Sequence, residues 1–387
     1  MTFLRSLRNY WLMFSCLPLG GLLVALLIYT VCAVIFIGWD EAMLGAVALI
    51  AVLFLTQWAG RWLSFYSRGT RALYEGNPAE ALKEFDAGLA LKRWRAGDPR
   101  RAMLLLGRVN ALMDSGAYPE AAPAAEECVN AFQAAWGAEH SYTLGALLAK
   151  GHAAIYLADF AEAEAICRRV CEAKRARYGP EHPDVALCLV SLGKLASERR
   201  EFAEAERCYR QALEVFRRGL KANDPQTGMA LNNIAYVLVR QGRIEEAESL
   251  AQEALEIARK ALPPRHYGQA AFWNTRSLIH VKKGEFVQAR ELLVEGVKLL
   301  EERYGDFHPQ LVHHLSLLAE IHLAEERYSD AETLCRRAVQ IAEERLRPRH
   351  PDRLEALELY ARILPEMGRG AEGAALREQI EQIKNAE

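Results

Sequence analysis

Small apolar residues recur along this chain at an interval of 42 positions. The series consists of Ala121, Ala163, Ala205, Ala247, Ala289, Ala331 and Gly373, and Ala81 precedes it by 40 positions. For most members, another small or apolar residue stands four positions later and one more stands twelve positions earlier. Residues four apart share one face of a helix, and small side chains let two helices pack at ~8–10 Å. The pattern therefore predicts repeated helical hairpins, each with a helix A and a helix B.

Polar residues mark the breaks between these units with the same period. They are His140, His182, Asp224, His266, His308 and His350, and four of them are followed directly by proline. Proline is favoured at the first position of a helix, and the residue before it occupies the place of a capping group. Because successive repeats hold these residues apart, we expect helix caps and not a shared metal or catalytic site.

Positions 61 to 384 resemble tetratricopeptide repeats. The 42-residue unit, the linker YGPEHPDV (178–185) and the segment LNNIA (231–235) are similar to the repeats of kinesin light chains. The resemblance implies an all-α superhelical solenoid over 61–387, with about eight hairpins of which the last is a degenerate cap. It also implies a concave face that binds peptides. We take over this architecture and not a motor role, because no heptad segment stands before the repeats.

Before the repeats, the chain contains two long apolar runs. Residues 14–37 are almost wholly apolar for 24 positions, and 42–58 form a second run of 17. About 20 apolar residues cross a bilayer as a helix, and Trp11, Trp39, Trp58 and Trp62 flank the runs as interfacial tryptophans do. We therefore expect residues 1–60 to be a membrane anchor of two transmembrane helices, ahead of the solenoid.

The charges around these runs predict their orientation. Arg5 and Arg8 precede the first run and Arg61 follows the second, whereas the turn between them holds only Asp40 and Glu41 as charged residues. The positive-inside rule places both termini and the repeats in the cytoplasm. A cleaved secretory signal is the competing interpretation, but its apolar segment would be too long. We expect an integral membrane protein, in the inner membrane of a bacterium.

Composition narrows the function further. The formal net charge is −2, from 48 basic and 50 acidic residues, which gives no general attraction to nucleic acid. Phosphate-binding glycine loops, nucleophile elbows and zinc-protease helices do not occur in the sequence. Cys167 and Cys171 lie four apart, but without a second pair at ligand spacing we favour buried thiols over a metal site. We expect no enzyme activity, no cofactor and no metal.

Candidate binding residues follow from the repeat register. Two positions of each helix A, three before and one after its small residue, should face the concave groove. A position five after that residue should extend the same surface. The predicted groove residues are Asn110, His152, Lys194, Asn232, Tyr236, Arg240, Asn274, Lys282, Ser316 and Glu320. An asparagine amide both donates and accepts, so it can hold the backbone of an extended peptide; ordinary solvated polar residues are the alternative interpretation.

Two functions of different class remain. The first is a membrane-anchored scaffold that binds peptide segments of protein partners at the cytoplasmic face, with the bilayer as its second contact. The second is a structural or assembly subunit of a membrane protein complex, for which Gly21 and Ala25 supply a weak helix-packing pattern. His280 and His322 share one register position, where core histidines are expected; with His313 and His314 they leave a local pH-responsive cluster as an alternative.

Overall fold

A computed structural model describes residues 62–385, except 92, 93, 96, 222, 263–265 and 267. The chain divides into two units, Met1–Phe65 and Tyr66–Glu387, and the second contains nearly all of the described residues. The two predicted membrane spans, 14–37 and 42–58, lie outside the described residues, so they stay predictions. Within the described range, no helix is both long and apolar enough to cross a bilayer.

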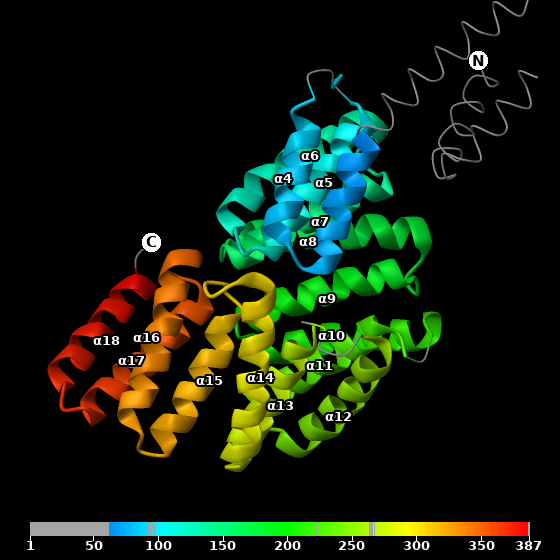
Figure 1. Cartoon of the computed structure of the whole chain (residues 1–387). Coiled ribbons are helices and arrows are strands. Elements are labelled where there is room, and N and C mark those ends of the chain that lie inside the picture. Colours follow the sequence, from blue (N-terminus) through cyan, green and yellow to red (C-terminus); the bar gives the residue numbers. More distant parts are fainter. Residues whose placement is uncertain are drawn as a thin grey trace, which may run out of the picture. The chain divides into compact units, whose positions relative to one another are not determined.

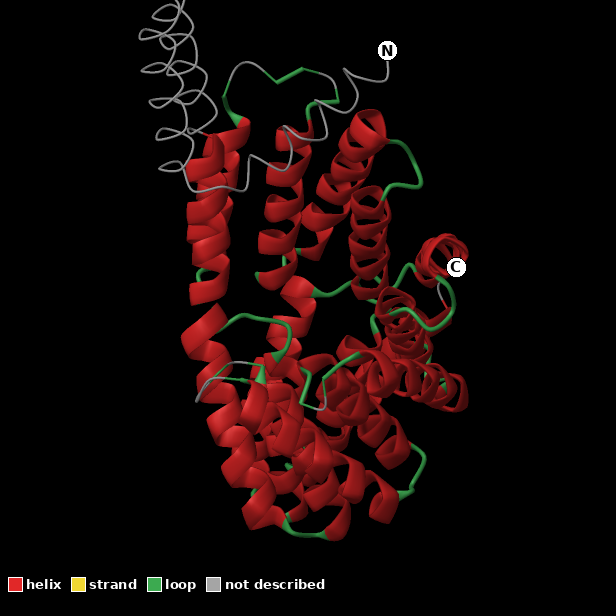
Figure 2. Ribbon diagram, turned by 90° about the vertical axis from the view of Figure 1, so that its right-hand side faces the viewer, coloured by secondary structure: helices red, strands yellow, loops and turns green. Residues whose placement is uncertain are grey.

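The described chain is a series of antiparallel helical hairpins, without a strand (Figure 1, Figure 2). The A helices are a helix over 62–75, α5 (Pro99–Asp114), α7 (Ser141–Tyr156), α9 (Pro183–Glu198), α11 (Pro225–Arg240), α13 (Gln269–Lys283), α15 (Leu311–Ala324) and α17 (Pro351–Glu366). The B helices are α4 (Pro78–Leu89), α6 (Tyr118–Trp136), α8 (Phe160–Tyr178), α10 (Phe202–Gly219), α12 (Ile244–Ala261), α14 (Phe286–Tyr304), α16 (Tyr328–Arg345) and α18 (Gly370–Asn385). The predicted all-α solenoid is confirmed.

The small residues of the 42-residue series lie where helix A meets helix B. All seven alanines of the series, Ala81 included, are 0 % exposed. Cys167 and Cys335, four positions after two of these alanines, are also fully buried. Each hairpin packs on the next one, and the buried apolar residues form several clusters along the solenoid and not a single centre. On α18 only Gly373 and Ile380 are buried, because no further described hairpin covers its outer face.

The polar residues at the breaks make the predicted capping bonds. His140, His182, Asp224 and His350 are the N-caps of α7, α9, α11 and α17, and each side chain accepts the backbone N–H two residues on. His266 and His308 make the same bond in the turns that lead into α13 and α15. An imidazole nitrogen can accept only while it is unprotonated. Burial lowers the pKa of His140, His266, His308 and His350, which favours the neutral ring that this bond requires.

Each turn from helix A to helix B contains one left-handed residue, and from Gly116 onward these residues recur every 42 positions. Glycine fills most of these places, but Ala158, Arg200 and Glu326 have φ values of 56°, 61° and 61°. The turn ends helix A with the double hydrogen bond of a Schellman motif; in the second hairpin Ala117 N–H donates to Leu112 O and Gly116 N–H to Met113 O. The repeat period is therefore built into the backbone as well as the core.

The solenoid also makes contacts between hairpins that are distant in sequence. Arg303, at the end of α14, donates to the carbonyl of Leu73 at 2.8 Å and lies 3.7 Å from the carboxylate of Asp114. His308 Nε2 lies 3.0 Å from the carbonyl oxygen of Asp114. At Gly116 an added Cβ would lie 2.5 Å from Cδ of Pro309. The first two hairpins therefore pack against the α14–α15 junction, and the superhelix closes on itself.

Candidate functional site

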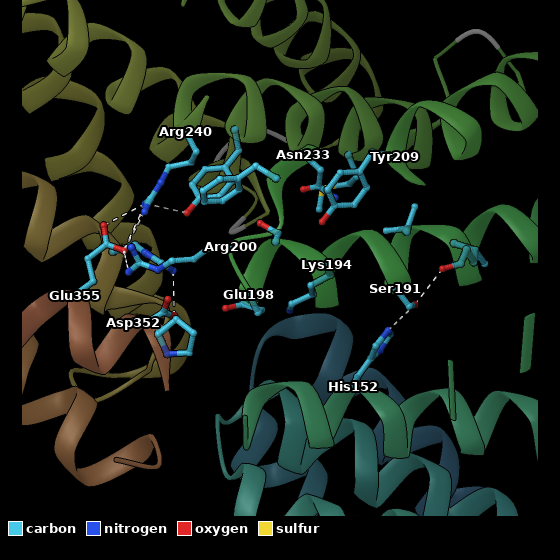
Figure 3. Close-up of a pocket in the computed structure, with 18 of the residues that line it drawn as sticks. His152, Ser191, Lys194, Glu198, Arg200, Tyr209, Asn233, Arg240, Asp352 and Glu355 are labelled. Atoms are coloured by element: carbon cyan, nitrogen blue, oxygen red, sulfur yellow. Dashed lines mark hydrogen bonds and ion pairs between the residues drawn. The ribbon is translucent and has the colours of Figure 1, made fainter. Parts of the chain in front are cut away.

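The concave side of the closed superhelix contains a hollow formed by two adjoining cavities. Their volumes are about 500 and 340 Å³, and they share Arg200, Tyr236, Arg240, His313, Asp352 and Glu355 as lining residues. The A helices α7, α9, α11, α15 and α17 supply most of the lining of the larger cavity (Figure 3), and α13 adds residues to that of the smaller one. We call these two cavities together the hollow, with a larger part beside α7 and α9 and a smaller part beside α13.

Most of the predicted groove residues line the hollow. His152, Lys194, Tyr236 and Glu320, one position after the small residue of their repeats, all do so, and Leu278 and Arg362 complete this row at the same 42-residue spacing. Arg240 and Lys282 extend it, as expected, and Asn274 and Ser316 line the smaller part. The residues of one register therefore come together on one continuous inner surface.

Two predicted groove residues lie elsewhere. Asn110 is exposed and does not line either cavity. Asn232 is only 5 % exposed and lines neither cavity, and its Oδ1 is buried without a hydrogen bond to another described residue. Consecutive residues of a helix are turned by about 100° from each other, and Asn233 is the one that lines the hollow.

Two polar atoms on the wall of the smaller cavity have no partner. Oδ1 of Asn274 and Oγ of Ser316 are buried and make no hydrogen bond to another described residue. They belong to α13 and α15, the A helices of successive repeats. A buried polar atom without a partner costs free energy of about 1–3 kcal/mol. A group that bonds to them would remove this cost.

The larger cavity combines an apolar wall with a few polar groups. Its apolar lining consists of Leu148, Leu187, Val190, Phe202, Tyr209, Met229 and Pro351. Lys194 donates to the hydroxyl of Tyr156, and against the effect of burial Tyr156 and Glu198 raise the pKa of this lysine. Lys194 is therefore a cation beside this apolar surface.

Ion pairs cross the hollow between distant repeats. Arg240 on α11 lies 3.1 Å from Glu355 on α17, and Arg200 lies 3.4 Å from the same carboxylate. Figure 3 shows both arginines directed toward Glu355. These pairs hold the eighth hairpin against the fourth and fifth.

Acidic groups and a histidine crowd the same wall. His313 Nε2 lies 3.1 Å from Asp352 Oδ2, and this carboxylate raises the pKa of His313 to about 9. Burial would raise the pKa of Asp352, but the His313 imidazolium holds it well below its usual range. Burial, and after it the charge of Asp352, raises the pKa of Glu198 to about 7.

Several of these wall residues were not predicted from the sequence. Glu198 could have been found, because it stands five positions after Gly193 in the same register as Arg240 and Lys282. Asp352 and Glu355 reach the hollow only through the curvature of the superhelix, which no spacing in the sequence reveals. Of the histidines compared above, His280 and His322 are 9 % exposed, as expected for core residues, and His314 bonds to the carbonyls of Gln310 and Ala270.

A serine and a histidine also meet in the hollow. Nε2 of His152 lies 2.8 Å from Oγ of Ser191, and that hydroxyl donates to the carbonyl of Leu187 at 3.0 Å. Burial, and after it the charge of Lys194, lowers the pKa of His152 to about 4. The serine proton is thus engaged with the helix backbone and not with the imidazole. This pair links two A helices and is not arranged for nucleophilic attack.

Family models match most of the repeat region. One model, described as tetratricopeptide repeat, matches residues 142–218, 199–260, 226–302, 268–343 and 310–372. A second model with the same description matches 66–139. The chain belongs to the tetratricopeptide repeat family. Repeats of this family generally bind protein partners and typically form non-catalytic scaffolds.

Solved structures with similar repeats include proteins from two organisms. Kinesin-light-chain TPR-like repeats of Podosopora anserina are 24 % identical, cover 53 % of this chain and 97 % of that chain, and give a TM-score of 0.39. A variant of those repeats with one substitution is 23 % identical over 52 % and 96 %, with a TM-score of 0.40. BtubC (BKLC) from P. vanneervenii is 18 % identical over 60 % and 90 %, with a TM-score of 0.43. Among curated proteins, none matches this chain significantly.

Proposed function

We propose that this chain is a membrane-anchored tetratricopeptide repeat scaffold whose hollow binds an extended peptide segment of a protein partner at the cytoplasmic face. The observation that carries the proposal is the pair of unpartnered buried atoms, Asn274 Oδ1 and Ser316 Oγ, on the wall of the hollow. They come from successive A helices, so they can bond to successive points along one extended chain. An amide oxygen accepts a backbone N–H whatever the side chain of the bound residue.

The larger cavity complements this backbone contact. Its apolar wall, which includes Phe202 and Met229, provides space for an apolar side chain of the bound peptide. Lys194 and Lys282 line the two cavities, and among the described side chains Lys194 bonds to a tyrosine hydroxyl and not to a carboxylate. The combination favours a peptide over a small polar metabolite, because apolar surface and backbone partners lie along one extended hollow.

The anchor is the second part of the proposal. The apolar runs 14–37 and 42–58 and the arginines outside them support two transmembrane helices, with both termini and the repeats in the cytoplasm. An inner membrane of a bacterium is the proposed location. A reporter that works only in the cytoplasm should be active when fused after Glu387. Activity of a periplasmic reporter at the same position would contradict this orientation.

Capture experiments distinguish this scaffold from a structural subunit of a membrane complex. A fragment that starts at Trp62 contains every described hairpin. As bait for solubilised membranes, a scaffold fragment should retain the same partner as the full chain. A matched fragment with Asn274→Ala and Ser316→Ala should lose that partner by about tenfold or more, since each lost bond costs ~1 kcal/mol. If only the full chain captures it, the contact lies in the anchor and the assembly role is favoured.

A further inference from the structure

Three side chains from distant repeats bring metal-binding atoms together on the wall of the hollow. Glu198 ends α9, His350 caps α17 and Asp352 lies in the first turn of α17. One donor atom of each lies within 4.8 Å of the donor atoms of the other two. Among the described residues, they are the only group of at least three histidine, cysteine or carboxylate side chains so close. No spacing in the sequence indicates this cluster, because its members belong to the fourth and eighth hairpins.

We propose that Glu198, His350 and Asp352 form a binding site for one divalent transition-metal ion, with zinc as the best match. An imidazole nitrogen with two carboxylate oxygens is a donor set that suits zinc. Magnesium and calcium prefer oxygen ligands alone and keep more of them. The ion's double charge also offsets the repulsion between two adjacent carboxylates.

His350 provides an observation independent of the acidic pair. The residue is 1 % exposed, and its Nε2 is buried without a hydrogen-bond partner among the described residues. Its Nδ1 accepts the N–H of Asp352 at 3.2 Å and lies 3.8 Å from the Asp352 carboxylate. An ion at Nε2 requires the ring proton to move to Nδ1, so the hydrogen bond from the Asp352 N–H is exchanged for the metal bond.

The surroundings orient these ligands. His313 bonds to Asp352 from α15 at 3.1 Å, the type of outer contact that holds a ligating carboxylate in place. Lys194, one turn before Glu198, is the nearby cation, and its ammonium group is bonded to the hydroxyl of Tyr156. A bound ion would join α9 to α17 across the hollow. It would therefore stabilise the closed form of the superhelix, independently of any peptide.

Zinc binding by the full chain in mild detergent tests this site. After metal removal with a chelator, isothermal titration should show one tight zinc ion per chain and no comparable binding of magnesium. Glu198→Gln, Asp352→Asn and His350→Asn should each weaken zinc binding by at least about tenfold. Asparagine at 350 still caps a helix, so the last variant removes the imidazole and keeps the fold. Zinc should also raise the melting temperature of the unmodified chain and not that of the variants.

Matched controls test whether other side chains of the protein, outside the cluster, bind the zinc instead. Glu320→Gln removes a hollow carboxylate outside the cluster, and His308→Asn removes the imidazole at the equivalent position of another repeat; both should bind zinc as the unmodified chain does. Cobalt in place of zinc should lack the thiolate charge-transfer band that the buried cysteines would produce. Full zinc affinity in the Glu198 and Asp352 variants, a thiolate band, or the absence of tight zinc binding would each overturn the proposal.

Discussion

At the scale of single residues, the repeat uses histidine as a helix cap, a role usually filled by serine, threonine, aspartate or asparagine. The ring adds a second contact, because the aromatic residue that ends helix B packs on it, stacked at Tyr178 and Tyr304 and tilted at Trp136. The centroid distances are 4.8 Å for Trp136 and His140, 4.7 Å for Tyr178 and His182, and 4.2 Å for Tyr304 and His308. One side chain thus caps the next helix and fixes the angle between repeats.

Such caps should make stability depend on pH, most clearly at His308. This residue is 3 % exposed, and burial lowers its pKa to about 4. The unfolded chain, with a histidine pKa near 6.5, then binds more protons than the folded chain between pH 4 and 6.5. The stabilisation is complete above that window and is lost as the pH falls through it. From about pH 7.5 to about pH 5 the linked loss amounts to ~2 kcal/mol.

The variant His308→Asn isolates this contribution, because asparagine caps a helix without titrating. The free energy of unfolding in urea should be lower than that of the unmodified chain at high pH, since the bond to Asp114 is lost, but should fall less on acidification. The parallel variant His140→Asn, at a cap that is only partly buried and whose pKa burial also lowers, should change the pH dependence less. Equal pH slopes in the chain and in His308→Asn would contradict the neutral-cap interpretation.

At the scale of the hairpin, the close approach of helix A and helix B depends on the small residue. In α8, Ala163 is 0 % exposed whereas Ala161, two positions earlier, is exposed. Ala163→Leu should overpack the contact and reduce the free energy of unfolding by ~1–3 kcal/mol. Ala161→Leu should change it by less than ~0.5 kcal/mol. Thermal melts of the two variants measure the difference, and similar losses would mean that the packing register is misassigned.

What the sequence could predict is also clearest at the scale of the hairpin. Helix boundaries, caps and buried alanines followed from the 42-residue period, because each depends on contacts within one repeat or between neighbours. Of the predicted row Asn110, His152, Lys194, Tyr236 and Glu320, the last four line the hollow and Asn110 does not. Asn232 stands one position before Asn233, which does line it. Whether Asn232 or Asn233 faces the hollow depends on how α11 is rotated about its axis. Packing against the neighbouring helices sets that rotation.

At the scale of the whole solenoid, the sequence did not reveal that the superhelix closes on itself. In most solenoids each repeat contacts only its neighbours, yet Arg303 bonds to Leu73 and Arg240 to Glu355 here. Small rotations between repeats accumulate along the solenoid and bring distant hairpins together. Glu198 meets Asp352 and His350 for the same reason.

Closure should couple the stabilities of distant hairpins. Arg303→Ala removes the bond to Leu73 and the pair with Asp114, so amide hydrogen exchange should become faster both in the helix 62–75 and near the α14–α15 junction. Arg337, which pairs with Glu301 of the preceding hairpin at 2.7 Å, is the matched control. Arg337→Ala should increase exchange only near its own repeat. No change over 62–75 in the Arg303 variant would show that the closing contacts contribute little.

Site-specific photo-cross-linking in membranes tests most directly whether a partner's peptide lies in the hollow. A cross-linking residue at Lys282, which lines the hollow on α13, is compared with one at Ser249, which is exposed on α12 and lines neither cavity. We expect a cross-linked partner from position 282 and none from 249, with the product lost when Asn274→Ala and Ser316→Ala are added. Cross-links from 249 alone, or a product from 282 that persists with both substitutions, would contradict peptide binding in the hollow.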